Sequence, residues 1–160
     1  MEYAIQEGKK AIAEGNFPFG CCIVSQNGEI ITEHNKALTS KSPLAHAEML
    51  AIWKMQKKNC FNSDNWSIYC TTKPCIMCLG AIYWSGIKNV FYGSDIIKLK
   101  VNGLDDIDYD ENNMDHISDK ISLIGGCMEK KCSALLNEWY KKNQLRLAYI
   151  NFRRKKDESE

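Results

Sequence analysis

Four side chains in two short segments have the types and spacing of a metal-dependent hydrolytic site. His46 is followed two residues later by Glu48, and Cys75 and Cys78 are separated by two residues. One imidazole and two thiolates make three zinc ligands, and a catalytic zinc site uses three so that its fourth position stays open for water. Glu48 supplies a carboxylate that can carry protons between that water and a substrate. The pattern therefore predicts Zn²⁺ as the cofactor.

The local structure around these residues must meet two conditions. Cys75 and Cys78 are three residues apart, so in a first helical turn they face the same side, and the helix N-terminus stabilises their thiolates. His46 and Glu48 differ by two positions, which is about 200° around a continuous helix. Both can serve one metal only if the helix begins close to His46. Pro43, which restricts the backbone before it, provides a boundary nearby.

Two other interpretations of the cysteine pair remain open. A C-x-x-C pair can be a redox site, but His46 and Glu48 are then unexplained. A structural zinc site with Cys70 as fourth ligand gives Glu48 no role. A catalytic site is the preferred interpretation because it uses all four residues. The remaining cysteines in strand-like or helix-start positions are interpreted as core or non-ligating residues: Cys21, Cys22, Cys70, Cys127 and Cys132.

Composition limits the function classes. The chain has 160 residues, with 44% hydrophobic and 26% charged residues, and its formal net charge is +1. This length predicts one domain over residues 1–150, followed by a charged tail over 151–160. The balanced charge favours a small substrate over a nucleic acid. We find no signal-peptide pattern and no apolar run that could cross a bilayer, so we expect a reduced, cytoplasmic protein.

Hydrophobic periodicity and turn signals predict an α/β fold. The expected order is a helix (3–14), two strands joined by an Asn27-Gly28 hairpin (20–25 and 29–33), a helix (45–58), a strand (67–71), a helix with Pro74 in its first turn (to about 84), a strand (89–93), a loop (98–119), a strand (121–124) and a final helix with a stripe of Leu135, Leu136, Trp139 and Tyr140. The β-α-β unit predicts two parallel strands. We expect a mixed five-stranded sheet with helices on both faces and a frayed tail from Arg153.

Beyond these four residues, the chain resembles the cytidine-deaminase-like superfamily of zinc deaminases, which act on nucleobases, over about residues 3–145. Within it, the resemblance is greatest to bacterial guanine deaminases. The residues that carry it are Pro18-Phe19-Gly20, Asn35, Ala45 to Glu48, Pro74 to Trp84, Asn89 to Tyr92 and Gly103-Leu104-Asp105-Asp106. The resemblance implies a three-layer sandwich and a homodimer.

The resemblance also implies roles for individual residues. Glu48 would be the catalytic acid and base, and Asp106 a second acid near a purine. Asn35, Phe19, Ala47 and Trp84 would bind the substrate.

Several of these residues have simpler interpretations. Asp106 lies in an acidic run that could be merely solvated, and Trp84 near a helix end could pack in the core. Asn35 could close a turn after its strand. His34 and His116 are interpreted as surface or turn residues.

Three features depart from the guanine deaminase pattern. Lys73 replaces the glutamate that usually precedes the Pro-Cys pair, and Leu104 replaces a phenylalanine. The run from Gly126 to Leu136 resembles the last helix of tRNA adenosine deaminases. These departures bear on which substrate is bound, and they leave the predicted reaction type unchanged.

The sequence therefore supports one preferred function and several alternatives. The preferred one is zinc-dependent deamination of guanine to xanthine with release of ammonia. The first alternative is deamination of adenosine in a tRNA anticodon loop, with basic residues of the C-terminal region contacting phosphates. Deamination of cytosine or another nucleoside is a further alternative. A non-enzymatic module that uses zinc only for folding would differ from all of these, because it would not need Glu48.

Overall fold

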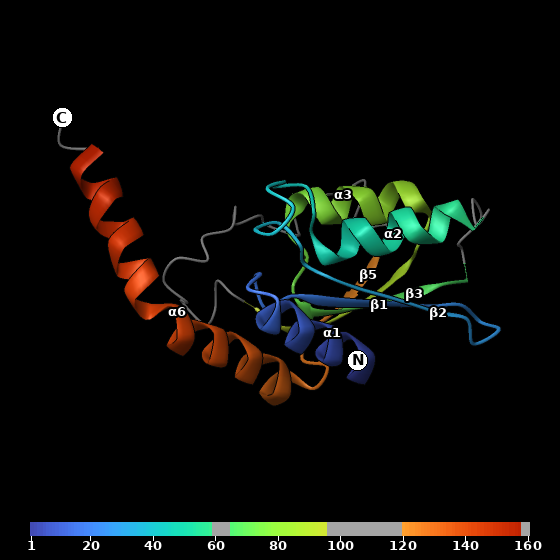
Figure 1. Ribbon diagram of the computed structural model, residues 1–160. Coiled ribbons are helices and arrows are strands. Elements are labelled where there is room, and N and C mark those ends of the chain that lie inside the picture. The colour runs from blue at the N-terminus through green and yellow to red at the C-terminus, as the bar shows by residue number, and fades with distance from the viewer. Residues whose placement is uncertain (59–64, 96–119, 158–160) are drawn as a thin grey trace.

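The computed structural model describes residues 1–58, 65–95 and 120–157 (Figure 1). Its five strands form one mixed sheet in the order β2-β1-β3-β4-β5. Strand β1 (Gly20–Val24) is antiparallel to both β2 (Ile30–His34) and β3 (Ser67–Thr72), whereas β3, β4 (Asn89–Ser94) and β5 (Ser122–Ile124) run parallel. The predicted mixed five-stranded sheet is confirmed.

The hairpin and the β-α-β unit were both predicted correctly. Gly28 has φ +80° in the turn between β1 and β2, a conformation that glycine adopts readily. Helix α3 (Ile76–Ser85) connects β3 to β4, and Tyr69 pairs with Phe91 in parallel register. The carboxyl end of β3 therefore leads directly into the cysteine segment.

Helices cover both faces of the sheet. Helices α2 (Ala47–Lys57) and α3 lie together on one face, and α1 (Glu2–Ala13) and the first part of α6 (Glu129–Asp157) lie on the other (Figure 1). The main core lies between the α2–α3 layer and the sheet, and it includes Ile23, Ala51, Met55, Ile68, Leu79, Ile82 and Val90. Smaller clusters that include Ile5, Leu135, Leu136 and Trp139 lie under α1 and α6. The expected three-layer arrangement is thus present.

The end of α6 corrects one expectation. We expected a frayed tail from Arg153, but the backbone is helical through Asp157, and the predicted domain boundary at residue 150 falls inside this helix. The residues from Arg153 to Asp157 are not apolar, yet four of the five are Arg or Lys and none is Gly or Pro, and such residues extend a helix that has already formed. In the described part of the chain, no helix is long and apolar enough to span a membrane.

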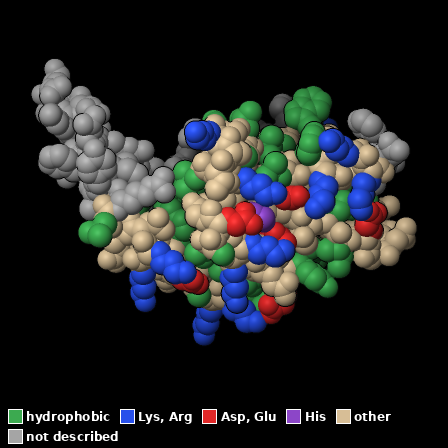
Figure 2. All heavy atoms as spheres, in the orientation of Figure 1, with side chains coloured by type: hydrophobic (Ala, Val, Ile, Leu, Met, Phe, Trp, Pro, Cys, Tyr) green, Lys and Arg blue, Asp and Glu red, His purple; other side chains and the backbone are tan. Residues whose placement is uncertain are grey.

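Charged side chains are interleaved on the face shown in Figure 2, where basic and acidic groups lie next to one another. Glu33, at β2, is paired with Lys36 at 2.8 Å and with Lys54 at 3.1 Å. Glu29 is paired with Lys58 at 2.8 Å. The balanced composition of the sequence is therefore reflected in local pairing of these side chains.

Candidate metal centre and active site

Both donor segments lie at the start of a helix. His46 is the N-cap of α2, with extended backbone angles of φ −73° and ψ 152°, and Cys75 is the N-cap of α3, with φ −70° and ψ 168°. Because His46 precedes the first helical residue, its side chain is not bound by the helical spacing that would turn it away from Glu48. The predicted start of the helix close to His46 is confirmed. Pro74 precedes the N-cap of α3, so its expected place in the first helical turn was wrong by two positions.

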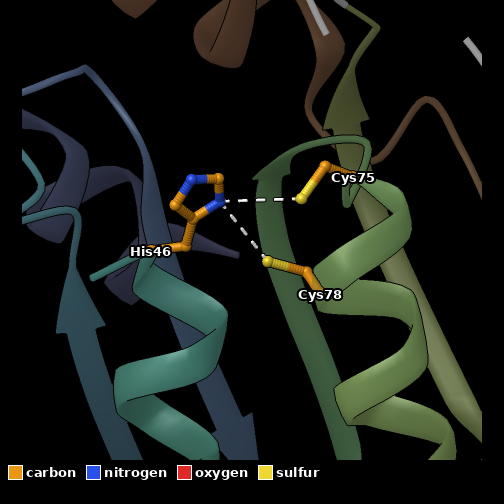
Figure 3. A group of neighbouring side chains, drawn as sticks. All are labelled: His46, Cys75 and Cys78. Carbon is orange, nitrogen blue, oxygen red and sulfur yellow. Dashed lines mark hydrogen bonds between the residues drawn. The ribbon is translucent and has the colours of Figure 1, made fainter. Parts of the chain in front are cut away.

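The three predicted ligands come together. The Nδ1 atom of His46 lies 3.6 Å from the Sγ atom of Cys75 and 3.5 Å from that of Cys78 (Figure 3). A tetrahedral zinc ion, with Zn–N near 2.0 Å and Zn–S near 2.3 Å, holds such donors about 3.6 Å apart. The donor types and their separations therefore fit zinc. Among the described residues, Cys70 is not part of this group, which argues against a fourth protein ligand.

The electrostatics of the two thiols favour metal binding. A hydrogen bond from Cys78 lowers the pKa of Cys75 to about 4, and nearby His46 acts in the same direction, although burial opposes both. The same bond and burial raise the pKa of Cys78. One thiolate is thus present at neutral pH, and binding of a metal would release the remaining thiol proton.

Glu48 lies beside this group. Its side chain is buried, with 8% of the residue exposed, and its Oε2 atom accepts a hydrogen bond from the Cys78 thiol at 3.5 Å. Burial raises the pKa of Glu48, and hydrogen bonds offset this only in part. A carboxyl group with a raised pKa next to a metal site is suited to general acid and base catalysis.

Asn35 and Phe19 are joined to each other by a backbone hydrogen bond, and Asn35 precedes the metal-binding histidine by 11 residues. The Asn35 N–H donates to the Phe19 carbonyl at 2.9 Å, and the Asn35 Oδ1 atom accepts from the Ala37 N–H at 3.0 Å. The second bond is the turn that the simpler interpretation expected. Asn35 is 1% exposed and Phe19 is half-buried, while Ala47 is fully buried at the start of α2.

Trp84 is not brought to the triad, and Asp106 cannot be placed relative to it. Trp84 is 85% exposed in the last turn of α3, about 13 Å along that helix from Cys75. It does not pack in the core, so the alternative interpretation of Trp84 was wrong. Asp106 lies outside the described residues, as do Leu104 and His116.

The sequence analysis misjudged a second buried cluster. His34 is 7% exposed, and its two ring nitrogens lie 2.7 Å from Glu7 and 2.9 Å from Glu14, so the expected surface position was wrong. The sequence also gave no reason to single out Asn16, which is completely buried. Both errors have one origin, since the partners of His34 and Asn16 are distant in the sequence.

Comparison with known proteins matches the chain to deaminases in each case. The profile of the family described as the cytidine and deoxycytidylate deaminase zinc-binding region matches residues 1–94. The chain is 32% identical to a tRNA-specific adenosine deaminase of Haemophilus influenzae over 147 residues, which cover 90% of this chain and 83% of that protein. It is 41% identical to a guanine deaminase of Bacillus subtilis over 90 residues, which cover 56% of this chain and 58% of that protein.

A solved structure described as a guanine deaminase from Nitrosomonas europaea has a similar fold. It superposes with a TM-score of 0.76 at 22% identity, over 86% of this chain and 81% of that one. This likeness supports the sheet and the helical layers described above.

Proposed function

The chain belongs to the cytidine and deoxycytidylate deaminase zinc-binding family, and we propose that its substrate is guanine, which it converts to xanthine and ammonia. Family membership and the three donors His46, Cys75 and Cys78 make it a zinc-dependent deaminase, a hydrolase. The observation that carries the reaction type is the position of Glu48 beside these donors. The choice of guanine as the substrate goes beyond the reaction type, and other observations support it.

Different residues would perform different parts of the reaction. Zinc held by His46, Cys75 and Cys78 would act as a Lewis acid and lower the pKa of a water molecule. Glu48 takes the two protons of the water molecule in turn, and delivers the first to a ring nitrogen and the second to the leaving amine. Water and guanine thus give xanthine and ammonia, with no other reactant. Glu48 is buried, so little of its side chain is open to solvent.

Binding of the base is assigned to Ala47, which follows His46 in the chain, and to the bonded pair Asn35 and Phe19. Asn35 would hydrogen-bond the base through its amide, and Phe19 and Ala47 would contact the ring plane and edge. Asp106 would provide a second acid next to the purine. Trp84, exposed at the far end of α3, can take part only in the site of another subunit.

Guanine is favoured over the alternatives by the match to the Bacillus subtilis guanine deaminase, where the identity is 41% over 90 residues. The net charge of +1 and the interleaved charges of Figure 2 also suit a small neutral base better than an RNA.

A tRNA adenosine is the second candidate, and α6 is the observation that favours it. The match to the Haemophilus influenzae enzyme covers 90% of the chain, whereas the guanine deaminase match covers 56%. The α6 residues Lys141 and Lys142 are exposed, although Lys142 is already paired with Glu138 at 2.8 Å. Binding of tRNA through such residues would weaken steeply as salt is raised.

The surface of α3 supports a homodimer. This helix has no charged residue, and its exposed positions include Ile76 and Trp84. Gly80, midway between them, has open space where a side chain would be, so another helix could approach closely. An apolar helix face of this kind usually packs against another surface.

The cysteines support a reducing compartment, and we place the enzyme in the cytoplasm. All seven cysteines in the described part of the chain are free thiols. Buried free thiols are usual where the compartment keeps them reduced.

The decisive test is release of ammonia by the zinc-loaded protein from a panel of guanine, adenine, cytosine, their nucleosides and tRNA. We expect turnover of guanine, its loss after zinc removal by a chelator, and its recovery when zinc is restored. Turnover of tRNA alone, with steep inhibition by salt, would replace guanine by the second candidate. Zinc binding without turnover of any of these compounds would contradict the deaminase assignment itself.

A further inference from the structure

Asn16 follows α1 and connects three parts of the molecule. It is completely buried, and its backbone carbonyl accepts a hydrogen bond from the Trp139 indole N–H of α6 at 2.9 Å. Its Oδ1 atom lies 3.0 Å from the backbone nitrogen of Thr39 and 3.1 Å from the Thr39 hydroxyl, and accepts from both. Its Nδ2 atom is buried and has no hydrogen-bond partner among the described residues, so the hydrogen bonds given for this side chain are made by its oxygen.

Thr39 belongs to the connection over residues 36–45, which has Asn35 at one end and His46 at the other. The Lys36 N–H donates to the Ala45 carbonyl at 2.9 Å and closes the base of this connection. Its interior bonds, such as Ser40 to Lys36, stay within the segment. Within the described part of the chain, Asn16 is the residue outside 35–45 whose side chain anchors the middle of the connection.

Trp139 also reaches Asn35 by a second route. Its ring lies 5.5 Å from that of Phe17, and the Phe17 ring is stacked on Phe19 with 6.1 Å between centroids. The Phe19 carbonyl in turn accepts the Asn35 N–H. Two routes, one polar and one aromatic, thus lead from one buried tryptophan of α6 to the residue assigned to the base.

The metal triad does not share these contacts. Cys75 and Cys78 lie at the start of α3, on the face of the sheet opposite to α1 and α6 (Figure 1). His46 is joined to the 36–45 connection, but its backbone is fixed as the N-cap of α2, where its carbonyl accepts the Leu50 N–H at 3.0 Å.

We infer that Trp139 and Asn16 are positioning residues through which α6 fixes Phe19 and Asn35, and so sets the affinity for the base without altering the metal triad. This inference rests on the proposed role of Phe19 and Asn35 in binding the base. It gives α6, which lies outside the 1–94 family match, a function in the active site.

The experiment compares Trp139→Phe and Asn16→Ala with the wild-type zinc-loaded protein. Trp139→Phe keeps an aromatic ring and removes the indole N–H together with the five-membered ring that carries it, while Asn16→Ala removes the acceptor of Thr39. Trp66→Phe is the matched control, because Trp66 is buried in the separate core under α2 and α3. The measurements are zinc content, kcat and KM for guanine, the Kd of the guanine analogue 8-azaguanine, and deuterium uptake by residues 36–45.

We expect KM and Kd to rise about tenfold in Asn16→Ala and about threefold in Trp139→Phe, as loss of buried hydrogen bonds predicts. Uptake over 36–45 should increase in both variants, while zinc content is unchanged and kcat stays within about twofold. The control should change none of these. Should Asn16→Ala fail to fold, Trp139→Phe carries the test.

Two results would overturn the inference. One is faster exchange with unchanged KM and Kd, which would make these residues purely structural. The other is loss of zinc or of kcat at unchanged KM. If the wild-type protein does not deaminate guanine, the guanine assignment fails separately, and the same comparison is made with the base that it does deaminate.

Discussion

Two buried glutamates in this molecule, each with a histidine nearby, have opposite chemical characters. Glu48 and Glu7 are almost equally buried, at 8% and 6% exposed, yet the pKa of Glu48 is raised and that of Glu7 is lowered. Burial raises the pKa in both cases. At Glu7, bonds from Lys10 at 2.6 Å, His34 at 2.7 Å and the Thr32 hydroxyl at 3.2 Å outweigh it.

Glu48 has no such set of donors. The side-chain partner described for it is the Cys78 thiol at 3.5 Å, and this bond offsets its desolvation only in part. Residue type and burial are therefore not enough to identify a reactive acid. The number of cationic and hydroxyl donors around it decides whether its pKa is raised or lowered.

The largest expected effect separates the two glutamates by activity. In Glu48→Gln we expect kcat to fall by about 10³-fold, because the proton carrier is lost. Zinc content should be unchanged, and the thermal midpoint should not fall, because a buried carboxyl group with a raised pKa is removed. The measurements are ammonia release, metal analysis and thermal denaturation. Glu29→Gln, at a surface carboxylate, serves as the control, and equal activity of Glu48→Gln and this control would refute the assignment of Glu48.

The opposite outcome is expected at Glu7, where stability should change and activity should not. Glu7→Gln should lower the free energy of unfolding by about 2 kcal/mol, because it leaves His34 and Lys10 without their shared carboxylate. Turnover by the folded fraction should remain close to that of the wild-type protein. Urea denaturation and kcat measure the two effects. Loss of turnover without loss of stability would mean that the Glu7 cluster belongs to the active site.

The difference between these clusters also explains what the sequence could predict. The ligand triad was predictable because each helix start is local: His46 adjoins α2, and Cys75 and Cys78 are three residues apart. The same holds for the hairpin, because the Asn27-Gly28 turn signal lies directly between the two strands that it joins.

The Glu7 cluster was not predictable in this way. Glu7 and His34 are 27 residues apart and meet only because α1 packs on β2. Likewise Asn16 and Trp139 are 123 residues apart, and no local pattern indicates their contact. The exposure of Trp84 also depends on packing. From the sequence alone, a tryptophan in an apolar helix is predicted to be a core residue, and only the positions of its neighbours show otherwise.

A smaller expected effect is that the stabilisation contributed by Glu7 depends on pH. Because the pKa of Glu7 is lowered on folding, its ionised form is favoured in the folded state, and this stabilisation is present above the ordinary value of 4.5. It is lost as pH falls below 4.5 through the lowered pKa. The groups that face Glu7 are Lys10 from α1 and His34 from β2. Urea midpoints at pH 7, 5 and 4 should therefore differ less between wild type and Glu7→Gln at the lowest pH, and a constant difference would contradict the assigned cause.

The smallest expected effect tests which donor keeps the Glu7 carboxylate ionised. Lys10 makes the shortest bond to Glu7, at 2.6 Å, but its side chain is 59% exposed, whereas that of His34 is 9% exposed. An ion pair with one partner in solvent contributes little, so Lys10→Met should lower the free energy of unfolding much less than Glu7→Gln does. In Lys10→Met combined with Glu7→Gln, the lysine change should add almost nothing, because its partner is already neutral. If Lys10→Met were as costly as Glu7→Gln, the lysine and not the buried histidine would be the main stabilising partner of this cluster.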